Sequence, residues 1–331
     1  NLDARNFFNP GRLPELKRHQ YGGSVGGPVF KNRTFYFGTY EALRLGEGVA
    51  QLRTVPTDRM WTGDLSELNK VIRDPRGGNF PNARIPADRL DQTSLKFRPF
   101  WPKPNLPGAA NNYAFVGTRT SDVDQFSGRI DHRFSDKDSL YGSYQFSQRE
   151  NVEPSNALCA NRGLPLFSCT EPERTQIFSL VQIHAFTPSL LNEFRVGFNR
   201  IRTNRFQDDL VLGDVVRQIG IPGLPSTDFF NGGVPQVAVT GFATIGGPTN
   251  LPQGRRVTNY SLVNGTTWVK GRHTMKGGID YKKYLFNSFF TQFGRGAFSF
   301  NGQFTGDGLG DFLIGGLRQT QRQPGEPFNN I

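Results

Sequence analysis

The chain has 331 residues, among them 39 glycines, 22 prolines and 30 phenylalanines but only 2 methionines. Glycine weakens a helix interior by about 1 kcal/mol relative to alanine and phenylalanine favours strands, so this composition argues against a helical protein. The formal net charge of +11 is spread along the chain without a basic run; it therefore suits a surface that meets anionic lipid or lipopolysaccharide, and we expect no nucleic acid partner.

Two hairpins are predicted in the first half of the chain. The first pairs Gln20–Val29 with Arg33–Arg44 around a turn at Phe30–Arg33. The second joins Asp124–Phe134 to Ser139–Ser147 through the sequence SDKD, which has the chemistry of a tight turn. Apolar and polar residues alternate along this second pair, and a period of two predicts strands with one apolar and one polar face.

Two further hairpins are predicted in the second half. Gln176–Thr187 turns at the sequence TPSL into Leu191–Ile201, and Val257–Val269 turns at KGRH into Thr274–Phe286. The alternation is clear in the returning strand of each pair. In Gln176–Thr187 both faces mix apolar and polar residues, so the orientation of that strand stays open.

The alternation assigns side chains to two faces. The apolar face is predicted to meet lipid and carries Phe126, Ile130, Phe134, Leu140, Tyr144, Phe146, Phe194, Val196, Phe198, Met275, Ile279 and Tyr281. The polar face is predicted to line a lumen and carries Arg129, Asp131, Arg133, Glu193, Arg195, Asp280 and Lys282. Charged rings in a lumen hold a plug or line a passage; the alternative is that these charges only neutralise one another across strands.

Long connections separate the hairpins, at about Leu45–Ser121, Gln148–Thr175 and Arg202–Arg256. Short turns at one end and long loops at the other are typical of an outer-membrane barrel, whose strands cross the bilayer with about 9–11 residues. A soluble β-sandwich is the alternative, but its turns recur every 8–12 residues or so. We therefore predict an all-β, antiparallel transmembrane outer-membrane β-barrel segment with short periplasmic turns and long extracellular loops.

Motifs for bond chemistry are not found in the sequence. The four histidines fall on different predicted elements, and no nucleophile or metal-binding motif includes them. The glycine-rich sequence GDGLGDFLIGG does not match a phosphate-binding loop and is predicted to form a short helix capped by Asp307 inside a loop. We therefore expect no enzyme, and no catalytic, cofactor-binding or metal-binding residues.

The two cysteines, Cys159 and Cys169, lie in a polar, proline-containing stretch without a CxxC motif. This spacing predicts a local disulfide that pins a loop, and hence an oxidising compartment. Two unpaired thiols are the alternative.

Five segments, taken in order, resemble the TonB-dependent receptors of the Oar-like type. They are Leu2–Pro10, Gln20–Arg44, Arg129–Ser147, Thr187–Arg200 and Lys270–Lys282. In that family an N-terminal carboxypeptidase-regulatory-like domain and a plug precede a large barrel. The resemblance implies that residues 1–331 are part of the barrel domain, beginning just past the plug, with the plug, the N-terminal domain and the C-terminal strands outside this sequence.

The resemblance also implies a function in the cell outer membrane of a Gram-negative-type bacterium. The barrel wall and extracellular loops are expected to bind a large solute, an oligosaccharide or a metal chelate, for TonB-dependent uptake without a cofactor. The expected partners are outer-membrane lipid and lipopolysaccharide, the protein's own plug, the TonB complex through a segment absent here, and the solute. The alternatives are an adhesion or matrix-export protein without active uptake, and a passive porin.

Overall fold

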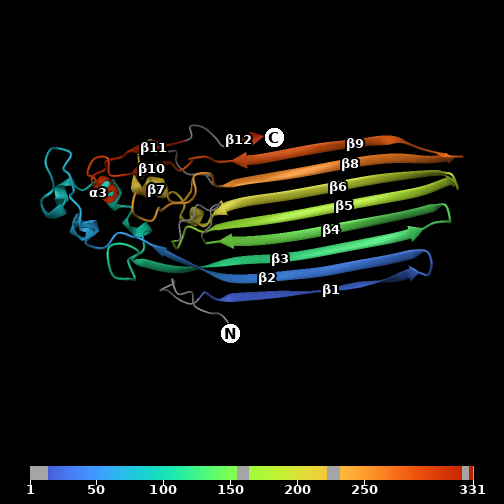
Figure 1. The fold of residues 1–331 in the computed structure, drawn as a ribbon, viewed down its shortest axis with the longest axis horizontal. Coiled ribbons are helices and arrows are strands. Elements are labelled where there is room, and N and C mark those ends of the chain that lie inside the picture. The colour runs from blue at the N-terminus through green and yellow to red at the C-terminus, as the bar shows by residue number, and fades with distance from the viewer. Residues whose placement is uncertain (1–13, 155–163, 222–231, 323–327, 331) are drawn as a thin grey trace.

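Long antiparallel strands run side by side in one broad sheet that forms a wall (Figure 1). The computed structural model describes residues 14–154, 164–221, 232–322 and 328–330. In these residues the sheet has nine strands in the order β1-β2-β3-β4-β5-β6-β8-β9-β12. Their bounds are β1 Leu16–Phe30, β2 Thr34–Arg53, β3 Tyr113–Arg133, β4 Asp138–Glu153, β5 Cys169–Thr187, β6 Leu190–Gln207, β8 Gln253–Lys270, β9 His273–Phe290 and β12 Phe328–Asn330.

The four predicted hairpins are confirmed as β1–β2, β3–β4, β5–β6 and β8–β9, each closed by a short turn at the same end of the wall, here called the turn end (Figure 1). The strands are longer than predicted, between 15 and 21 residues. The connections are correspondingly shorter, at residues 54–112, 154–168 and 208–252. The predicted strands are too short because charged residues and glycines interrupt the simple alternation of apolar and polar residues at the strand ends toward the long connections. In the structure the register of β2 with β3 continues without a break to Arg53 and Tyr113.

The connections at the opposite end of the wall fold together into a separate unit, here called the loop module, which comprises residues 54–112, 164–168, 208–221, 232–252 and 291–318. It lies beyond the ends of the long strands (Figure 1). A three-stranded sheet of order β11-β10-β7 runs through it, and its strand β11 adds residues 319–321 to the loop module. Its elements are η1 Met60–Thr62, η2 Ser66–Leu68, η3 Pro81–Ala83, η4 Ala87–Arg89, α1 Gln92–Leu95, η5 Arg98–Phe100, η6 Asp208–Leu212, α2 Val215–Ile219, β7 Gln236–Val239, β10 Ala297–Phe300, α3 Gly308–Leu313 and β11 Gln319–Gln321.

The main hydrophobic core of the described residues lies in the loop module, not behind the wall. At its centre the ring of Phe312 on α3 is 1% exposed. Its centroid lies 5.1 Å from that of Phe300, 5.6 Å from that of Trp101 and 6.2 Å from that of Trp61, all in edge-to-face geometry. Aromatic pairs in this arrangement stabilise beyond their buried area, so residues far apart in sequence are fixed into one unit.

Helix α3 forms where the sequence predicts a capped helix. The Asp307 carboxylate accepts hydrogen bonds from the backbone N–H groups of Leu309 at 2.9 Å and Gly310 at 3.4 Å. Glycine is needed at two helix positions by close approach, because a Cβ would lie 2.8 Å from the Thr240 carbonyl oxygen at Gly308 and 2.5 Å from the Thr305 hydroxyl at Gly310. None of the helices in the described residues is long and apolar enough to cross a membrane.

Candidate polar face and loop module

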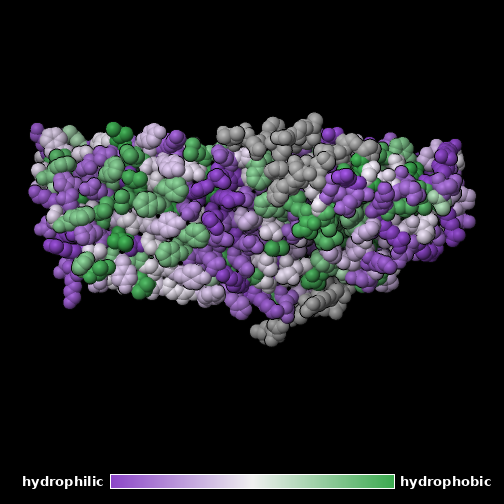
Figure 2. All heavy atoms as spheres, turned by 180° about the vertical axis from the view of Figure 1, so that it is seen from behind, coloured by the Kyte–Doolittle hydropathy of each residue, from purple (hydrophilic) through white to green (hydrophobic). Residues whose placement is uncertain are grey.

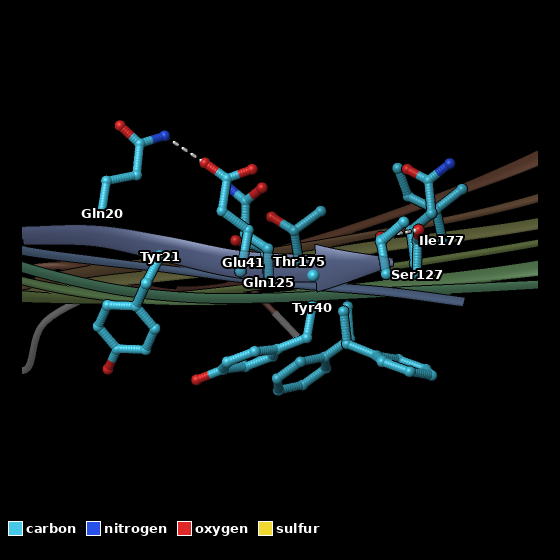
Figure 3. A pocket seen from close by; sticks show the side chains of 15 residues that line it. Gln20, Tyr21, Tyr40, Glu41, Gln125, Ser127, Thr175 and Ile177 are labelled. Carbon is cyan, nitrogen blue, oxygen red and sulfur yellow. Dashed lines mark hydrogen bonds between the residues drawn. The ribbon is translucent and has the colours of Figure 1, made fainter. Parts of the chain in front are cut away.

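The strand register separates the predicted side chains onto two faces of the wall. The twelve residues predicted to meet lipid share one face, here called the aromatic face, and the seven charged residues share the other, here called the polar face. Figure 3 shows the division, with Tyr21 and Tyr40 on one side of the sheet and Gln20, Glu41 and Thr175 on the other. The register also orients β5, placing Phe178 on the aromatic face and Val181 on the polar face.

The mixed pattern of β5 has a simple origin. Its polar face carries Ile177, Val181 and Ile183, so both sides of the strand contain apolar residues. Val181 is 2% exposed. Only the pairing with β4 and β6 decides the orientation, because the residue types on each side do not.

Near the turn end, the charged residues of the polar face pair along single strands. Arg129 contacts Asp131 at 2.6 Å and Lys282 contacts Asp280 at 2.8 Å, and Arg195 pairs with Glu193 in the same way. Arg133 pairs instead with Asp136 of the adjoining turn at 2.8 Å. The charges therefore neutralise one another, but along strands and not across them. Such exposed pairs contribute at most about 1 kcal/mol each.

Above these charges the polar face carries a band of carboxamides and hydroxyls that lines a hollow of about 800 Å³ (Figure 3). This amide band is formed by Gln20, Thr39, Glu41, Gln125, Ser127, Gln145, Ser147 and Thr175. The Thr39 and Ser127 hydroxyls lie 2.6 Å apart, and the Gln20 amide donates to Glu41 at 2.5 Å. Gln125 and Gln145 are exposed, and their side chains make no hydrogen bond to other described residues.

Close to the loop module, ion pairs across strands complete the polar face. Arg119 joins two strands by contacting Glu47 at 3.1 Å and Glu153 at 2.9 Å. Arg149 contacts Glu173 at 3.1 Å. The predicted loops included these residues, so none of them was among the predicted polar-face residues. Arg149, Asn151 and Glu153 continue the polar pattern at every second position of their strand, and that signal could have extended the predicted strand.

Several oxygen atoms on the polar face have no hydrogen-bond partner. Within the described part of the chain these include Oδ1 of Asn151, Asn199 and Asn259. Asn199 and Asn259 sit directly opposite each other on β6 and β8, in the same register row as Ser127 and Gln145. Buried polar atoms of this kind normally bind water or a ligand, so this row offers acceptors to whatever occupies the inner side of the wall.

The aromatic face is divided by a hydrophilic row that follows the register across five strands, β3, β4, β5, β6 and β8. Its members are Asp124, Gln148, Arg174, Arg202 and Arg256, with Arg44 bound to Asp124 at 2.8 Å. Figure 2 shows a hydrophilic band between the loop module and the turn-end half of the wall. Hydrophobic side chains gather over that turn-end half. About ten residues separate Asp124 from the turn after Phe134, which is the length that a barrel strand needs to cross a bilayer.

The loop module is held by ion pairs as well as by its core. Arg295 and Asp209, which are 4% and 0% exposed, contact each other at 3.1 Å, and Arg295 also donates to the Pro248 carbonyl at 2.9 Å. Lys70 contacts the helix-capping Asp307 at 2.8 Å. These contacts connect segments from different loops, so the module behaves as one folded unit.

Acid should loosen the loop module. The Ser66 hydroxyl and Arg59 lower the pKa of Asp64, and Arg89, 3.0 Å away, lowers the pKa of Asp74. A carboxylate whose pKa is lower in the folded protein stabilises the fold at pH values above its unfolded-state pKa of about 3.9. This stabilisation is lost as the pH falls through the lower, folded-state pKa. We expect the fluorescence of the loop-module tryptophans to change when the pH falls below about 4. The change should be smaller in Asp74→Asn. If that substitution leaves the acid response unaltered, the Asp74 carboxylate does not stabilise the module.

Cys159 and segment Leu2–Pro10 lie outside the described residues. Cys169 is disulfide-bonded, but its predicted partner Cys159 lies outside them, so the local pairing stays a prediction. Segment Leu2–Pro10 of the family resemblance also lies outside. Among the described residues, no three His, Cys, Asp or Glu side chains gather in a way that could hold a metal ion.

Comparison with known proteins gives one family and two structural likenesses. The chain resembles the outer membrane transporter YddB from Escherichia coli at 10% identity and TM-score 0.43, covering 86% of this chain and 27% of that one. It resembles the siderophore receptor PiuA from Acinetobacter baumannii at 12% identity and TM-score 0.31, covering 89% of this chain and 44% of that one. The chain thus spans less than half the length of either, and no curated protein matches it.

The family comparison covers the whole sequence. The family model described as an outer membrane beta barrel domain matches residues 1–331. It agrees with the antiparallel sheet, the short turns and the crossing length of the aromatic face, and it locates the protein in the cell outer membrane. The chain therefore belongs to the outer membrane beta-barrel domain family.

Proposed function

We propose that the chain is part of the wall of a TonB-dependent uptake receptor, with its polar face toward the lumen and its aromatic face toward lipid. The loop module would receive a large solute outside the cell, and the polar face would pass it inward once the protein's own plug moves. The residue patterns that resemble the Oar-like receptors support this proposal, as does the family membership.

The amide band is the observation that carries the proposal. Its hollow of about 800 Å³ is lined on the polar face by amides, hydroxyls and one carboxylate, Glu41, and no Lys or Arg is among its lining residues in the described part of the chain. A sugar presents hydroxyl groups that both donate and accept, whereas an anionic chelate would favour a surplus of Arg or Lys. Of the two expected solutes, a neutral oligosaccharide therefore suits this band better.

Uptake should fall when the band loses its free amides. In cells that produce the full-length protein, we expect the Gln125→Leu/Gln145→Leu double variant to take up labelled neutral oligosaccharides roughly tenfold more slowly, since each lost hydrogen bond is worth about 0.5–1.5 kcal/mol. Gln182→Leu is the matched control, because Gln182 is exposed on the aromatic face. Equal uptake by all three proteins, or an effect on a ferric chelate alone, would count against an oligosaccharide.

Energy coupling is tested separately. Collapse of the proton gradient, or removal of TonB, should stop the uptake of the labelled sugar if the protein is an energised receptor. Uptake that continues would indicate a passive porin.

Adhesion without uptake is a second candidate, favoured by the loop module. A unit with its own core holds its outer surface in one shape, which suits a stable contact with another surface. Cells that attach to a glycan-coated surface through this protein, yet take up no labelled sugar, would favour this reading.

A further inference from the structure

A shallow groove of about 490 Å³ crosses the aromatic face where glycines from three adjacent strands lie close together. Gly38 on β2 is directly opposite Gly128 on β3, and Gly142 on β4 is opposite Ile130, two residues along from Gly128. The rims are Tyr36, Phe126, Ile130, Leu140, Tyr144, Phe178 and Leu180. This glycine groove is lined almost entirely by apolar atoms, so it suits a hydrocarbon chain and not a polar solute.

The groove is open above the glycines. A Cβ on Gly38 would meet nothing closer than the Ser127 carbonyl oxygen at 3.8 Å, and one on Gly128 would meet the edge of the Phe126 ring at 3.5 Å. A strand that lacks side chains leaves a trench between the taller rims, and the trench spans three strands here. Bulk lipid can contact any apolar surface, but a trench with aromatic walls contacts one chain on several sides.

The groove lies at the middle of the apolar zone and extends from there toward the turns. That zone runs from the hydrophilic row at Asp124 to the turn after Phe134, and Gly128 lies near its middle. At about 3.3 Å per residue and a tilt of about 40°, Gly128 would be about 12 Å from the turn end, close to the middle of an apolar band about 25 Å tall. Because short turns of such barrels face the periplasm, the part of the groove nearer the turns lies on the periplasmic side of the bilayer.

Basic side chains lie at the same end of the same strands. Lys31 and Arg33 are in the turn before β2, and Lys137 is in the turn between β3 and β4. All three are exposed, and none forms an ion pair within the described residues. The two turns are adjacent, because the backbone N–H of Arg133 donates to the Arg33 carbonyl at 2.7 Å. An anionic group held here would lie at the turn end of the same strands that carry the groove.

We propose that the glycine groove and these three basic residues form a binding site for one anionic glycerophospholipid of the periplasmic leaflet. One acyl chain lies in the trench over Gly38, Gly128 and Gly142, and the phosphate meets Lys31, Arg33 and Lys137. Apolar contact along the trench holds the chain. The three cations select an anionic headgroup over a zwitterionic one.

The test uses the protein purified from outer membranes in mild detergent, stripped of lipid and then mixed with phosphatidylglycerol, phosphatidylethanolamine or lipopolysaccharide. Native mass spectrometry counts the lipids that remain bound. We expect one phosphatidylglycerol on the wild-type protein. Gly38→Val should lower its retention about tenfold, the change expected when about two methylene groups lose contact. Gly277→Val is the matched control, since a Cβ there has open space, without any atom within 4 Å, and lies on the same face outside the groove.

Two further variants keep the test decisive. Gly142→Ala fills the trench from the opposite wall, where the added methyl meets the flexible end of Leu180 at 3.3 Å, and should weaken retention in the same direction. Neutralising Lys31, Arg33 and Lys137 to Gln should remove the preference for phosphatidylglycerol over phosphatidylethanolamine. The proposal is overturned if both groove variants retain lipid as well as Gly277→Val, or if the wild-type protein retains phosphatidylethanolamine or lipopolysaccharide equally well.

Discussion

Replacing Phe312 with alanine should destabilise the loop module by about 3–5 kcal/mol, the usual cost of removing a buried aromatic side chain. Phe312 is 1% exposed and its ring contacts those of Trp61, Trp101 and Phe300, so a cavity would open where segments 54–112 and 291–318 meet. Hydrogen exchange measured by mass spectrometry should show faster exchange of the amides in β10 and α3, while the long strands exchange as before.

The control for this prediction is Val211→Ala. Val211 also belongs to the module but is 87% exposed, so its truncation should leave exchange in α3 unchanged. If Phe312→Ala exchanges at the wild-type rate in β10 and α3, then the module is not held by its aromatic core.

Replacing Arg295 with methionine should cost a similar 3–5 kcal/mol or so, for an electrostatic reason. The substitution leaves the Asp209 carboxylate charged, 0% exposed and without its partner. Burial already raises the pKa of Asp209, and Arg295 opposes that rise. The penalty relative to wild type should therefore shrink as the pH is lowered, since a protonated carboxyl carries no buried charge.

The double variant Asp209→Asn/Arg295→Met tests the electrostatic cause. Asparagine keeps an oxygen for the backbone N–H of Val234, which donates to Asp209 at 2.8 Å, and no buried charge remains. We expect the double variant to regain most of the lost stability, measured as the exchange rate of amides near Val234. A double variant less stable than the single one would show that lost packing, and not the unpaired charge, dominates.

In the proposed receptor, Phe312→Ala and Arg295→Met should affect solute binding by the loop module without changing the strands of the wall. A loosened loop module should lower solute binding at the cell surface while leaving the amide band and the glycine groove intact. Oligosaccharide uptake and phospholipid retention are therefore expected to respond to different substitutions.

The wall could be predicted from the sequence because strand alternation is a local property. Residues 126, 130 and 134 repeat at even spacing, so the side chains that share the aromatic face could be named before any pairing was known. The SDKD and KGRH turns fixed the hairpin partners in the same local way. The cap of α3 by Asp307 could likewise be predicted from the sequence, because a capping side chain accepts hydrogen bonds from backbone N–H groups only two and three residues ahead.

Tertiary structure alone decided what the long connections do. Four of the core residues, Trp61, Trp101, Phe300 and Phe312, come from two distant segments, 54–112 and 291–318, and no local period marks them as one core. The pairing of Arg119 with Glu47 and Glu153, and the opposition of Gly38 to Gly128, depend on which strands become neighbours. The register decides which residues of neighbouring strands lie opposite each other, and it depends on the whole sheet and not on any one segment. The amide band and the glycine groove therefore could be located only from the tertiary structure. The same holds for the loop module, whose core joins segments from different connections.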